Sequence, residues 1–430
     1  MKSVYIALSL DFIHHGHIKI INEALKYGEI TLGLLTDKAI SEKKQIPYLN
    51  FEQRKKVAEN LKGIKKIIKQ NEWDYSTNIL RYKPDFFIHG DDWKVNEPEH
   101  RKKIINALSE YGGKLVEIPH TKNISSTKIK NGLLNIEILP NVRVSSLKRI
   151  LENKKISRFV ESHSPLSAMI IENLILEKKD KKIFFDGFWS SSLTDSTVLG
   201  KPDIEAINIS QRLTNINNIF EVTSKPMIVD GDTGGLSQHF NMNIRALERQ
   251  GVSAVIIEDK KGLKKNSLLG NEIKQEQEEI DIFCKKISSG VKNKMSNDFM
   301  IIARLESLIL EKGMDDALLR AEKYLESGAD GIMIHSRQNS PDEVFKFSEK
   351  FRDLSDKTLV SVPTSYNKTY LEEFEKRSFN IVIYANHMLR ASYEAMEKVA
   401  IEILKNERTF EIEKDIINIK KILKLIPGTI

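Results

Sequence analysis

The feature that most constrains this chain is a series of eight short apolar runs in its C-terminal two thirds. The runs span residues 158–162, 182–188, 226–232, 254–259, 299–304, 331–336, 359–364 and 381–386. Most are separated by segments with helical periodicity, and eight strand–helix units in succession predict a (β/α)8 barrel of the TIM type. Nearly every run ends in polar residues, which in such a barrel would gather at one face. We therefore expect a barrel over 145–430, with one or two amphipathic helices in the tail from about residue 404.

The first 133 residues predict a second, separate α/β unit. Strand signals (VYIALSL, EITLGLLT, KPDFFIHGDD and KLVEIP) alternate with helical segments (HIKIINEALKYG and NFEQRKKVAENL). Gly28 is expected to cap the first helix and Asn50 to open the second. This alternation predicts a Rossmann-like, doubly wound parallel sheet over 1–133. The segment 134–144, with Pro140, is expected to be a linker.

Composition excludes several classes of protein. With 40% hydrophobic and 30% charged residues, the chain of 430 residues is typical of globular proteins. No apolar run approaches the roughly 20 residues needed to cross a bilayer. The N-terminus does not predict a secretory signal, because a histidine cluster follows its short apolar stretch. A single cysteine, Cys284, excludes a disulfide framework, so the cytoplasm is the expected compartment.

The net charge of +7 has two interpretations. One is nucleic-acid binding. The other, which we favour, is a lysine-rich surface, because the lysine pairs are scattered and usually lie beside Glu or Asp. Small anionic substrates fit the same charge. We expect neither a nucleic-acid nor a membrane partner.

The sequence His14-His15-Gly16-His17 follows a predicted strand and opens a helix. A helix N-terminus offers free N–H groups and a positive dipole to a phosphate. Two histidines there can hydrogen-bond phosphate oxygens, and Gly16 allows close approach of the backbone. A zinc site is the alternative, disfavoured by the lack of a third ligand. The segment Ser125-Ser126-Thr127-Lys128, at another predicted helix start, suits a triphosphate.

These elements together resemble the cytidylyltransferase family of the glycerol 3-phosphate and phosphocholine type, over about residues 1–133. The resemblance implies that an acceptor oxygen attacks the α-phosphate of CTP in line, with Mg²⁺ present and pyrophosphate leaving directly. It assigns catalysis to His14 and His17. It assigns nucleotide binding to Ser9, Asp11, Gly16, Lys43, Lys44, Arg54, Gly90, Asp91, Ser125, Ser126, Thr127 and Lys128. The family's usual Gly-Thr-Phe-Asp is replaced here by Leu8-Ser9-Leu10-Asp11, and its Arg-Thr-x-Gly by residues 120–123, so we expect a nonstandard acceptor.

Acidic residues close two neighbouring strands of the predicted barrel. Asp230 and Asp232 end one strand, and Glu258 ends the next. Oxygen ligands at adjacent strand ends predict a Mg²⁺ site, although Asp-Gly-Asp is also common in ordinary turns. Arg304 and His335 end the following strands, which indicates an anionic, phosphorylated substrate.

This pattern closely resembles phosphoenolpyruvate mutase of the isocitrate lyase superfamily, over about residues 145–400. The matching segments are 189–193, 200–203, 230–234, 258–267, 303–306, 333–336, 362–366 and 385–387. The resemblance implies conversion of phosphoenolpyruvate to phosphonopyruvate. It assigns Mg²⁺ to Asp230, Asp232 and Glu258, catalysis to Asp203, Lys264, Asn266, Arg304 and His335, and substrate binding to Trp189, Ser191, Ser192, Leu193 and Ser267. A loop carrying Lys264, Asn266 and Ser267 would close and exclude water, whereas Trp189 could equally be a packing residue.

Alternatives remain for both halves. A phosphonopyruvate hydrolase would share most of the barrel residues. A lyase is disfavoured, because Cys284 lies outside the context of that superfamily's catalytic cysteine. The order of the two halves resembles the bifunctional enzyme family of the fosfomycin pathway. That resemblance implies cytidylylation of a small phosphonate such as 2-hydroxyethylphosphonate, the alternative being a phosphate monoester such as phosphocholine or glycerol 3-phosphate. It also implies a homodimer or homotetramer formed through the barrel.

Overall fold

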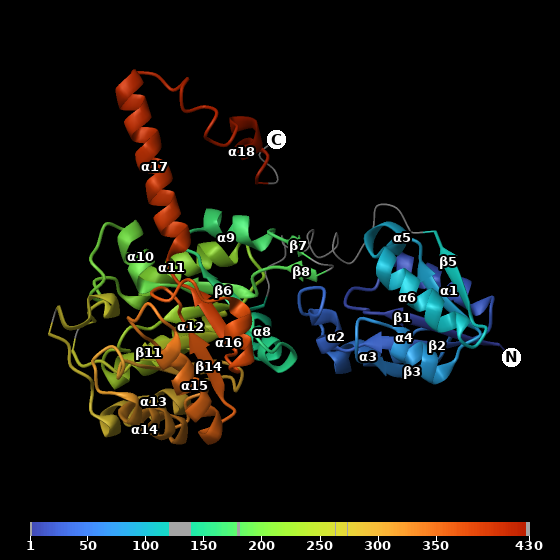
Figure 1. The fold of residues 1–430 in the computed structure, drawn as a ribbon, viewed down its shortest axis with the longest axis horizontal. Helices are drawn as coiled ribbons and strands as arrows, with labels where there is room; N and C mark the ends of the chain where they lie inside the picture. Colours follow the sequence, from blue (N-terminus) through green and yellow to red (C-terminus); the bar gives the residue numbers. More distant parts are fainter. Residues whose placement is uncertain (1, 120–138, 179–180, 263, 273, 427–430) are drawn as a thin grey trace.

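The protein consists of two α/β units, a five-stranded sheet and a closed eight-stranded barrel (Figure 1). The structure is a computed structural model that describes residues 2–119, 139–178, 181–262, 264–272 and 274–426. Both predicted fold classes are confirmed. Within the described residues, no helix is both long enough and apolar enough to span a membrane.

The N-terminal sheet is entirely parallel, with strand order β3-β2-β1-β4-β5. Its strands are β1 (Ser3–Leu8), β2 (Glu29–Leu35), β3 (Ile64–Gln70), β4 (Phe86–Gly90) and β5 (Lys114–Ile118). The strand order reverses between β1 and β4, and such a switch point creates a crevice beyond the carboxyl ends of the strands. The sequence analysis missed β3, an edge strand whose lysines break the apolar pattern, as is common at sheet edges.

Within residues 2–119, six helices cover the two faces of this sheet. They are α1 (His15–Leu25), α2 (Asp37–Ser41), α3 (Phe51–Glu59), α4 (Ser76–Tyr82), α5 (Trp93–Asn96) and α6 (Pro98–Ser109). Helix α3 begins as predicted, because Asn50 and Gln53 form a reciprocal capping box with two N–H···O bonds of 2.9 Å. The predicted cap at Gly28 is wrong, since α1 ends at Leu25 and Lys26 is its C-cap. Gly28 instead allows a close approach of backbones, because a Cβ there would lie 1.9 Å from the Lys2 carbonyl oxygen.

The barrel closes where its last strand pairs with its first. Its strands are β6 (Ser157–Glu161), β9 (Gly187–Ser190), β10 (Met227–Asp230), β11 (Ala254–Glu258), β12 (Met300–Leu305), β13 (Gly331–Ile334), β14 (Thr358–Ser361) and β15 (Ile381–Tyr384). The second predicted strand, 182–188, is wrong in its boundaries. Residues Lys181–Ile183 form β8, which pairs with β7 (Leu176–Lys178) in an antiparallel hairpin. The barrel strand starts only after Asp186, whose carboxylate accepts the Arg158 N–H at 2.9 Å.

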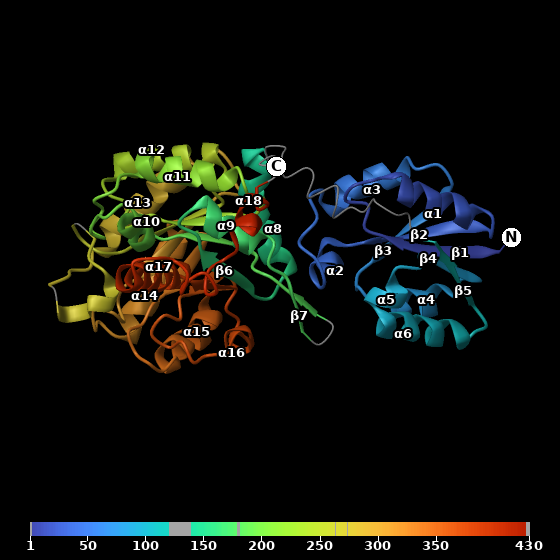
Figure 2. The same cartoon turned by 90° about the horizontal axis from the view of Figure 1, so that it is seen from above.

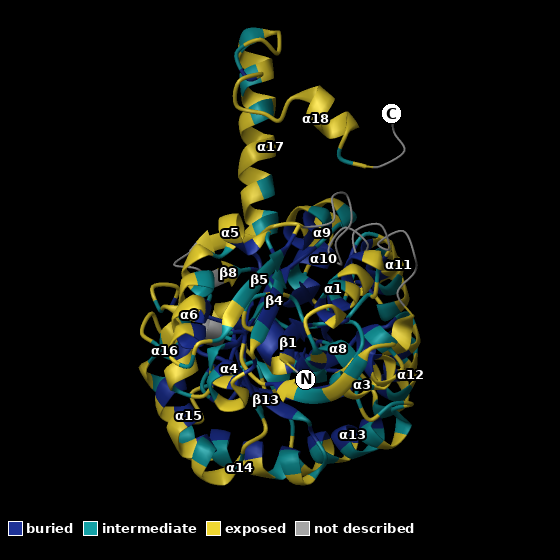
Figure 3. Ribbon diagram, turned by 90° about the vertical axis from the view of Figure 1, so that its right-hand side faces the viewer, coloured by how far each residue is buried: buried dark blue, intermediate teal, exposed yellow. Residues whose placement is uncertain are grey.

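Helices surround the barrel and extend beyond it. They are α8 (Pro140–Asn153), α9 (Pro165–Glu172), α10 (Ser192–Val198), α11 (Ile209–Phe220), α12 (Ser237–Gln250), α13 (Ile280–Asn293), α14 (Met314–Glu326), α15 (Asp342–Leu354), α16 (Leu371–Lys376), α17 (His387–Asn406) and α18 (Ile419–Leu423). Proline in the first turn suits a helix start, so the last part of the expected linker belongs to α8; residues 134–138 lie outside the described ranges. Helix α17 projects from the barrel without a buried residue (Figure 3).

The two units contact each other at the amino ends of the barrel strands. The Arg149 guanidinium, on α8, donates to the Pro47 and Tyr48 carbonyl oxygens at 2.8 and 3.1 Å. It also pairs with Asp37 Oδ2 at 3.2 Å. A small cavity between the units is lined on the barrel side by segments that precede β9 and β10. The N-terminal unit therefore lies against the end of the barrel opposite the carboxyl ends of its strands.

Candidate active sites

The histidine motif forms its own helix cap between β1 and α1. The Gly16 N–H donates to His14 Nδ1 at 3.1 Å, and the His14 N–H donates to His17 Nδ1 at 3.4 Å. The ring centroids of His14 and His17 lie 4.0 Å apart. Burial, with repulsion from His14 and Lys44, lowers the pKa of His17 to about 4. Since each Nδ1 accepts a hydrogen bond, each neutral ring carries its proton on Nε2. The motif thus presents two imidazole N–H donors beside a helix N-terminus.

A cavity of about 870 Å³ lies at the switch point of the sheet. Its walls include the predicted catalytic residues His14 and His17 and the predicted nucleotide-binding residues Ser9, Gly16, Lys43, Lys44 and Gly90. Aromatic side chains add an apolar wall, in which the His89 and Trp93 rings stack at 4.0 Å. The cavity thus combines a planar apolar surface with cationic and N–H groups. That combination can hold a base and a polyphosphate together.

Lys44 lies against the aromatic wall, with its ammonium 5.1 Å from the centre of the Trp73 ring. Desolvation by the cavity walls lowers the pKa of Lys44, although part of the side chain is accessible. Glu97 opposes the shift, and Lys182 adds to it. The ammonium is therefore less solvated than a typical surface lysine, which favours pairing with an anion.

Arg54 lies beneath the cavity and is fully buried. Its guanidinium donates to the carbonyl oxygens of Ser9, Leu35 and Leu49 and to Asp37 Oδ1, at 2.5–3.0 Å. All of these partners belong to the protein, so the geometry assigns Arg54 to support of the strand ends. Its predicted contact with the nucleotide stays a prediction.

The remaining predicted nucleotide-binding residues fall into two groups. Asp11 Oδ1 accepts the Leu49 N–H at 3.0 Å, and the Asp91 N–H donates to the Ile118 carbonyl oxygen at 3.0 Å. Both residues thus contribute to the structure of the loops around the cavity. Ser125, Ser126, Thr127 and Lys128 lie outside the described residues.

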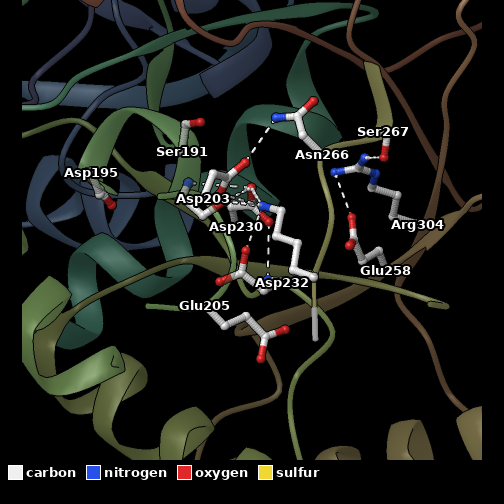
Figure 4. A network of polar contacts seen from close by, with 12 residues as sticks. Ser191, Asp195, Asp203, Glu205, Asp230, Asp232, Glu258, Asn266, Ser267 and Arg304 are labelled. Carbon is white, nitrogen blue, oxygen red and sulfur yellow. Dashed lines mark hydrogen bonds and ion pairs between the residues drawn. The ribbon is translucent and has the colours of Figure 1, made fainter. Parts of the chain in front are cut away.

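In the barrel, the predicted residues gather at the carboxyl ends of the strands (Figure 4). The Lys264 ammonium lies among three carboxylates, 3.4 Å from Asp203 Oδ1, 3.1 Å from Asp230 Oδ2 and 2.6 Å from Asp232 Oδ1. Ser192 donates through both its N–H and its hydroxyl to Asp230 Oδ2, at 3.4 and 2.8 Å. Burial alone would lower the pKa of Lys264, but Asp230, Asp232 and Glu258 raise it well above its usual range. Lys264 is therefore held as a cation.

Asn266 and Ser267 follow Lys264 on the same loop. Asn266 Nδ2 donates to Asp203 Oδ2 at 2.9 Å, and the Ser267 hydroxyl accepts from Arg304. Lys264 and Ser267 are each 3% exposed. This part of the loop after β11 is therefore packed against the site; its closure during the reaction stays a prediction.

Arg304 stands between two carboxylates at the ends of β11 and β12. It lies 3.2 Å from Glu258 Oε2 and 2.6 Å from Glu306 Oε1. Burial raises the pKa of Glu258 to about 7, although Arg304 and Lys260 oppose the shift. Burial acts in the same direction on Glu306, but the positive charges of Arg304 and Lys260 outweigh this effect and lower the pKa of Glu306 to about 2. Adjacent strands thus offer one easily protonated and one firmly ionised carboxyl group.

The predicted catalytic residue His335 and the other predicted substrate-binding residues lie at the same end of the barrel. Trp189 is buried in the barrel interior, and its Nε1 has no hydrogen-bond partner. His335 is also buried without a partner for Nδ1, and burial together with Arg304 lowers its pKa to about 3. Ser191 is the N-cap of α10, which Ser192 and Leu193 begin. Unpartnered buried donors at a strand-end site indicate room for a polar ligand.

The sequence analysis missed several members of the network. Lys260 and Glu306 follow Glu258 and Arg304 by two residues, so strand alternation could have found them. Arg212, on α11, carried no local signal. It pairs with Asp195 at 2.9 Å and donates to the Ser190 carbonyl oxygen at 3.0 Å and to that of Asp230.

The barrel site has the charge that a divalent cation requires. Its buried carboxylates (Asp195, Asp203, Asp230, Asp232, Glu258 and Glu306) outnumber its buried cations (Lys260, Lys264, Arg212 and Arg304). Asp203 Oδ1, Asp232 Oδ1 and the Glu258 carboxylate oxygens are buried against the cations Lys260, Lys264 and Arg304. Among the described residues, no three or more His, Cys, Asp or Glu side chains already form a metal-binding group. The oxygen ligands nevertheless suit Mg²⁺, and Lys264 lies at the centre of them here.

Comparison with known proteins agrees with both sites. Residues 147–404 match the family model for phosphoenolpyruvate phosphomutase, and residues 9–132 match a cytidylyltransferase-like family. The phosphoenolpyruvate phosphomutase of Tetrahymena pyriformis is 32% identical over 284 residues, covering 66% of this chain and 91% of that protein.

Solved structures give the same result for the barrel. The crystal structure of phosphoenolpyruvate phosphomutase from Streptomyces platensis subsp. rosaceus has a TM-score of 0.60 and 32% identity, covering 65% of this chain and 93% of that one. A phosphonopyruvate hydrolase in complex with oxalate and Mg²⁺ has a TM-score of 0.59 and 30% identity, covering 67% and 95%.

Fold, sites and similarities together define a two-part enzyme, in which a nucleotidyltransferase-like domain is followed along the chain by an isomerase barrel. The chain belongs to the phosphoenolpyruvate phosphomutase family, and it carries a cytidylyltransferase-like domain at its N-terminal end.

Proposed function

We propose that the barrel interconverts phosphoenolpyruvate and phosphonopyruvate. The bond between the enol oxygen and phosphorus breaks, a bond between phosphorus and C3 forms, and the enol oxygen becomes the ketone oxygen. Nothing is oxidised, and no proton is gained or lost overall. The observation that carries this proposal is a closed, buried site in which Arg304 and Lys264 lie among carboxylates at the strand ends.

Each residue of the barrel site has a role that follows from its position. Mg²⁺ held by Asp230, with Asp232 and Glu258, would supply positive charge to the carboxylate and enolate oxygens of the substrate. Arg304 and His335 would hold the moving phosphoryl group. Asp203, oriented by Asn266, would be its transient acceptor or would orient it.

Exclusion of water favours a mutase over a hydrolase. Phosphoryl transfer of this kind is loose and metaphosphate-like, so water in the site would capture the phosphoryl group. The burial of Lys264 and Ser267 supports a closed, dry site. The test supplies phosphonopyruvate and Mg²⁺ to the full chain and follows phosphorus by NMR. Phosphoenolpyruvate is the expected product; inorganic phosphate with pyruvate would indicate a hydrolase, and no turnover would refute the proposal.

Replacing Lys264 tests the network directly. Lys264→Ala leaves three buried carboxylates without their cation and opens the loop to water. We expect kcat to fall about 100-fold or more, with released phosphate forming a larger share of the remaining product. Lys261→Ala is the matched control, because Lys261 is an exposed lysine on the same loop. Equal activity in the two variants would contradict the role of Lys264.

We propose further that the N-terminal domain transfers CMP from CTP to a small phosphonate such as 2-hydroxyethylphosphonate. A phosphonate oxygen would attack the α-phosphorus, and the bond to the β-phosphate oxygen would break to release pyrophosphate. The Nε2–H groups of His14 and His17 would stabilise the charge on the α-phosphate, and Lys43 and Lys44 would hold phosphate oxygens. The cavity that joins these groups at the helix N-terminus carries the proposal.

The acceptor is tested by incubating the full chain with CTP, Mg²⁺ and one candidate at a time. The candidates are 2-hydroxyethylphosphonate, 2-aminoethylphosphonate, phosphonopyruvate, phosphocholine and glycerol 3-phosphate. A CMP-linked phosphonate signal in phosphorus NMR is the expected result. Activity with a phosphate monoester alone would replace the phosphonate assignment, and no pyrophosphate release with any candidate would refute it.

We also propose that the chain assembles into a homodimer or homotetramer through the barrel end that carries α17. This 20-residue helix has no buried residue in the single chain. Its apolar side chains Tyr393, Met396 and Leu404 are 61%, 64% and 80% exposed. A second copy would cover this surface.

A further inference from the structure

A hairpin formed by β7 and β8 extends from the barrel toward the N-terminal domain. The connection from α9 to β9 spans residues 173–186, whereas those from α12 to β11 and from α15 to β14 span only 251–253 and 355–357. Short connections are usual at this end of a barrel. The extra length forms β7 and β8, which extend from the barrel toward the other domain in both views (Figures 1 and 2).

The hairpin contributes side chains to the cavity of the N-terminal domain. Glu177 on β7 and Lys182 on β8 line the same 870 Å³ cavity as His14, His17 and Lys44. The two hairpin residues are cross-strand partners, and Lys182 Nζ lies 3.8 Å from Glu177 Oε1. Lys182 also contributes to the lowered pKa of Lys44, so the two ammonium groups act on each other.

The base of the hairpin is fixed to the barrel. Phe184 is buried, with the Lys154 ammonium 4.3 Å from its ring centre. Asp186 pairs with the same lysine at 2.5 Å. Arg149 ties the barrel to the N-terminal domain through the Pro47 and Tyr48 carbonyl oxygens. The position of Lys182 is therefore set by packed and hydrogen-bonded groups on both sides.

We propose that Lys182 is a substrate-binding residue of the nucleotidyltransferase site, supplied by the barrel, and that it binds a phosphorus oxyanion. The proposal rests on the function proposed for that site. The anion belongs either to the CTP triphosphate or to the acceptor phosphonate. In the absence of substrate, Glu177 is the partner of Lys182 and competes with the anion for it. If the barrel were removed, the part of the cavity formed by residues 2–119 would lose this cation.

The test compares variants of the full chain. Lys182→Ala is expected to raise KM about tenfold for one anionic substrate of the transfer reaction, and to leave the barrel reaction unchanged. A rise in KM for CTP would show that Lys182 binds the triphosphate. A rise in KM for the phosphonate would show that Lys182 binds the acceptor. Lys155→Ala is the matched control, because Lys155 is an exposed barrel lysine that does not line the cavity.

A second variant is expected to change KM in the opposite direction. Glu177→Gln removes the competing carboxylate, so KM for the same substrate should fall about two- to threefold. Opposite effects from paired residues cannot arise from a general loss of folding. Unchanged KM values for Lys182→Ala, or an equal change in Lys155→Ala, would overturn the proposal.

Failure of this inference can be told apart from failure of the proposed function. If the natural chain transfers CMP to no acceptor, the function proposed for the domain fails. Calorimetric binding of CTP and of 2-hydroxyethylphosphonate to the natural chain and to Lys182→Ala still tests the contact. Weaker binding of either by the variant supports it, and equal binding of both refutes it.

Discussion

Two buried arginines support the two active sites in the same way. Arg54 donates to the Ser9 and Leu35 carbonyl oxygens just after β1 and at the end of β2, and Arg212 donates to the Ser190 and Asp230 carbonyl oxygens at the ends of β9 and β10. In each case one guanidinium joins the carboxyl ends of adjacent strands. Each also pairs with a carboxylate, Asp37 or Asp195. The planar donor array of arginine suits this role, and lysine cannot reproduce it.

Replacing Arg54 tests this support. Arg54→Lys keeps the charge but leaves buried carbonyl oxygens without donors, so we expect the free energy of unfolding to fall by about 2 to 3 kcal/mol. Urea denaturation followed by tryptophan fluorescence measures the loss. Lys56→Arg, at an exposed position of the same helix, is the control. A rise in KM for CTP without a loss of stability would instead favour direct contact between Arg54 and the nucleotide.

The pKa of His17 predicts how stability depends on pH. It is about 4 in the folded chain, lowered by burial and by His14 and Lys44, against about 6.5 when unfolded. Between these values the unfolded state binds more protons, so stability falls as pH decreases from about 6.5 toward 4. Protonation of Nδ1 would also break the hydrogen bond from the His14 N–H.

The His17→Gln variant isolates this contribution. Between pH 7.5 and pH 5, the natural chain should lose about 2 kcal/mol more of its unfolding free energy than the variant. Urea denaturation at the two pH values measures the difference, in which other titrating groups cancel. An equal loss in both proteins would show that the pKa of His17 is not lowered.

Among the helices, α17 has an apolar face that the single chain leaves uncovered. Tyr393, Met396, Ile403 and Leu404 recur at the spacing of one helical face, and this face is exposed. The helix projects from the barrel (Figure 1). In proteins, most of the stability of a helix comes from the packing of its apolar face, and beyond its first turn α17 lacks such packing in the single chain.

A charge on this face should therefore prevent assembly. Met396→Glu is expected to shift the chain to a smaller species in analytical ultracentrifugation, because a carboxylate would be buried in the interface. Glu397→Gln, at the neighbouring position of the same helix, is the control. An unchanged sedimentation coefficient in Met396→Glu would contradict assembly through α17.

At the scale of the whole molecule, the two sites lie at opposite ends of the barrel. The mutase site is at the carboxyl ends of the strands, and the N-terminal domain lies at their amino ends. In Figure 2 the loop after β11 is on the far side of the barrel from the N-terminal domain. Direct transfer of an intermediate between the sites is therefore not built into the arrangement.

The contact between the domains should matter for only one of the two reactions. Arg149→Ala removes the hydrogen bonds to Pro47 and Tyr48 and loosens the position of Lys182. We expect a rise in KM for CMP transfer of the same sign as in Lys182→Ala, an unchanged barrel reaction, and a larger radius of gyration in small-angle X-ray scattering. A change in the barrel reaction would show that the two sites are coupled.

Both fold classes, and most of the strand ends that carry the sites, were predictable from the sequence. Strands that are buried on both faces stand out as continuous apolar runs, and residues such as Asp230, Glu258 and Arg304 lie at the ends of those strands. This is why strand-end reasoning brought together residues that the structure confirms as neighbours. The roles assigned to them remain predictions.

The side chains that reach each site from distant parts of the chain were not predictable from local sequence patterns. Arg212 reaches the site from a helix, Lys264 lies among carboxylates from the end of β10 and from the segment before α11, and Lys182 enters a cavity of the other domain. The sequence assigned 182–188 to one barrel strand, because an edge hairpin and a buried strand have the same apolar alternation over a few residues. Local patterns fix periodicity and capping, whereas long-range contacts depend on how elements pack, and packing leaves no signal at a single position.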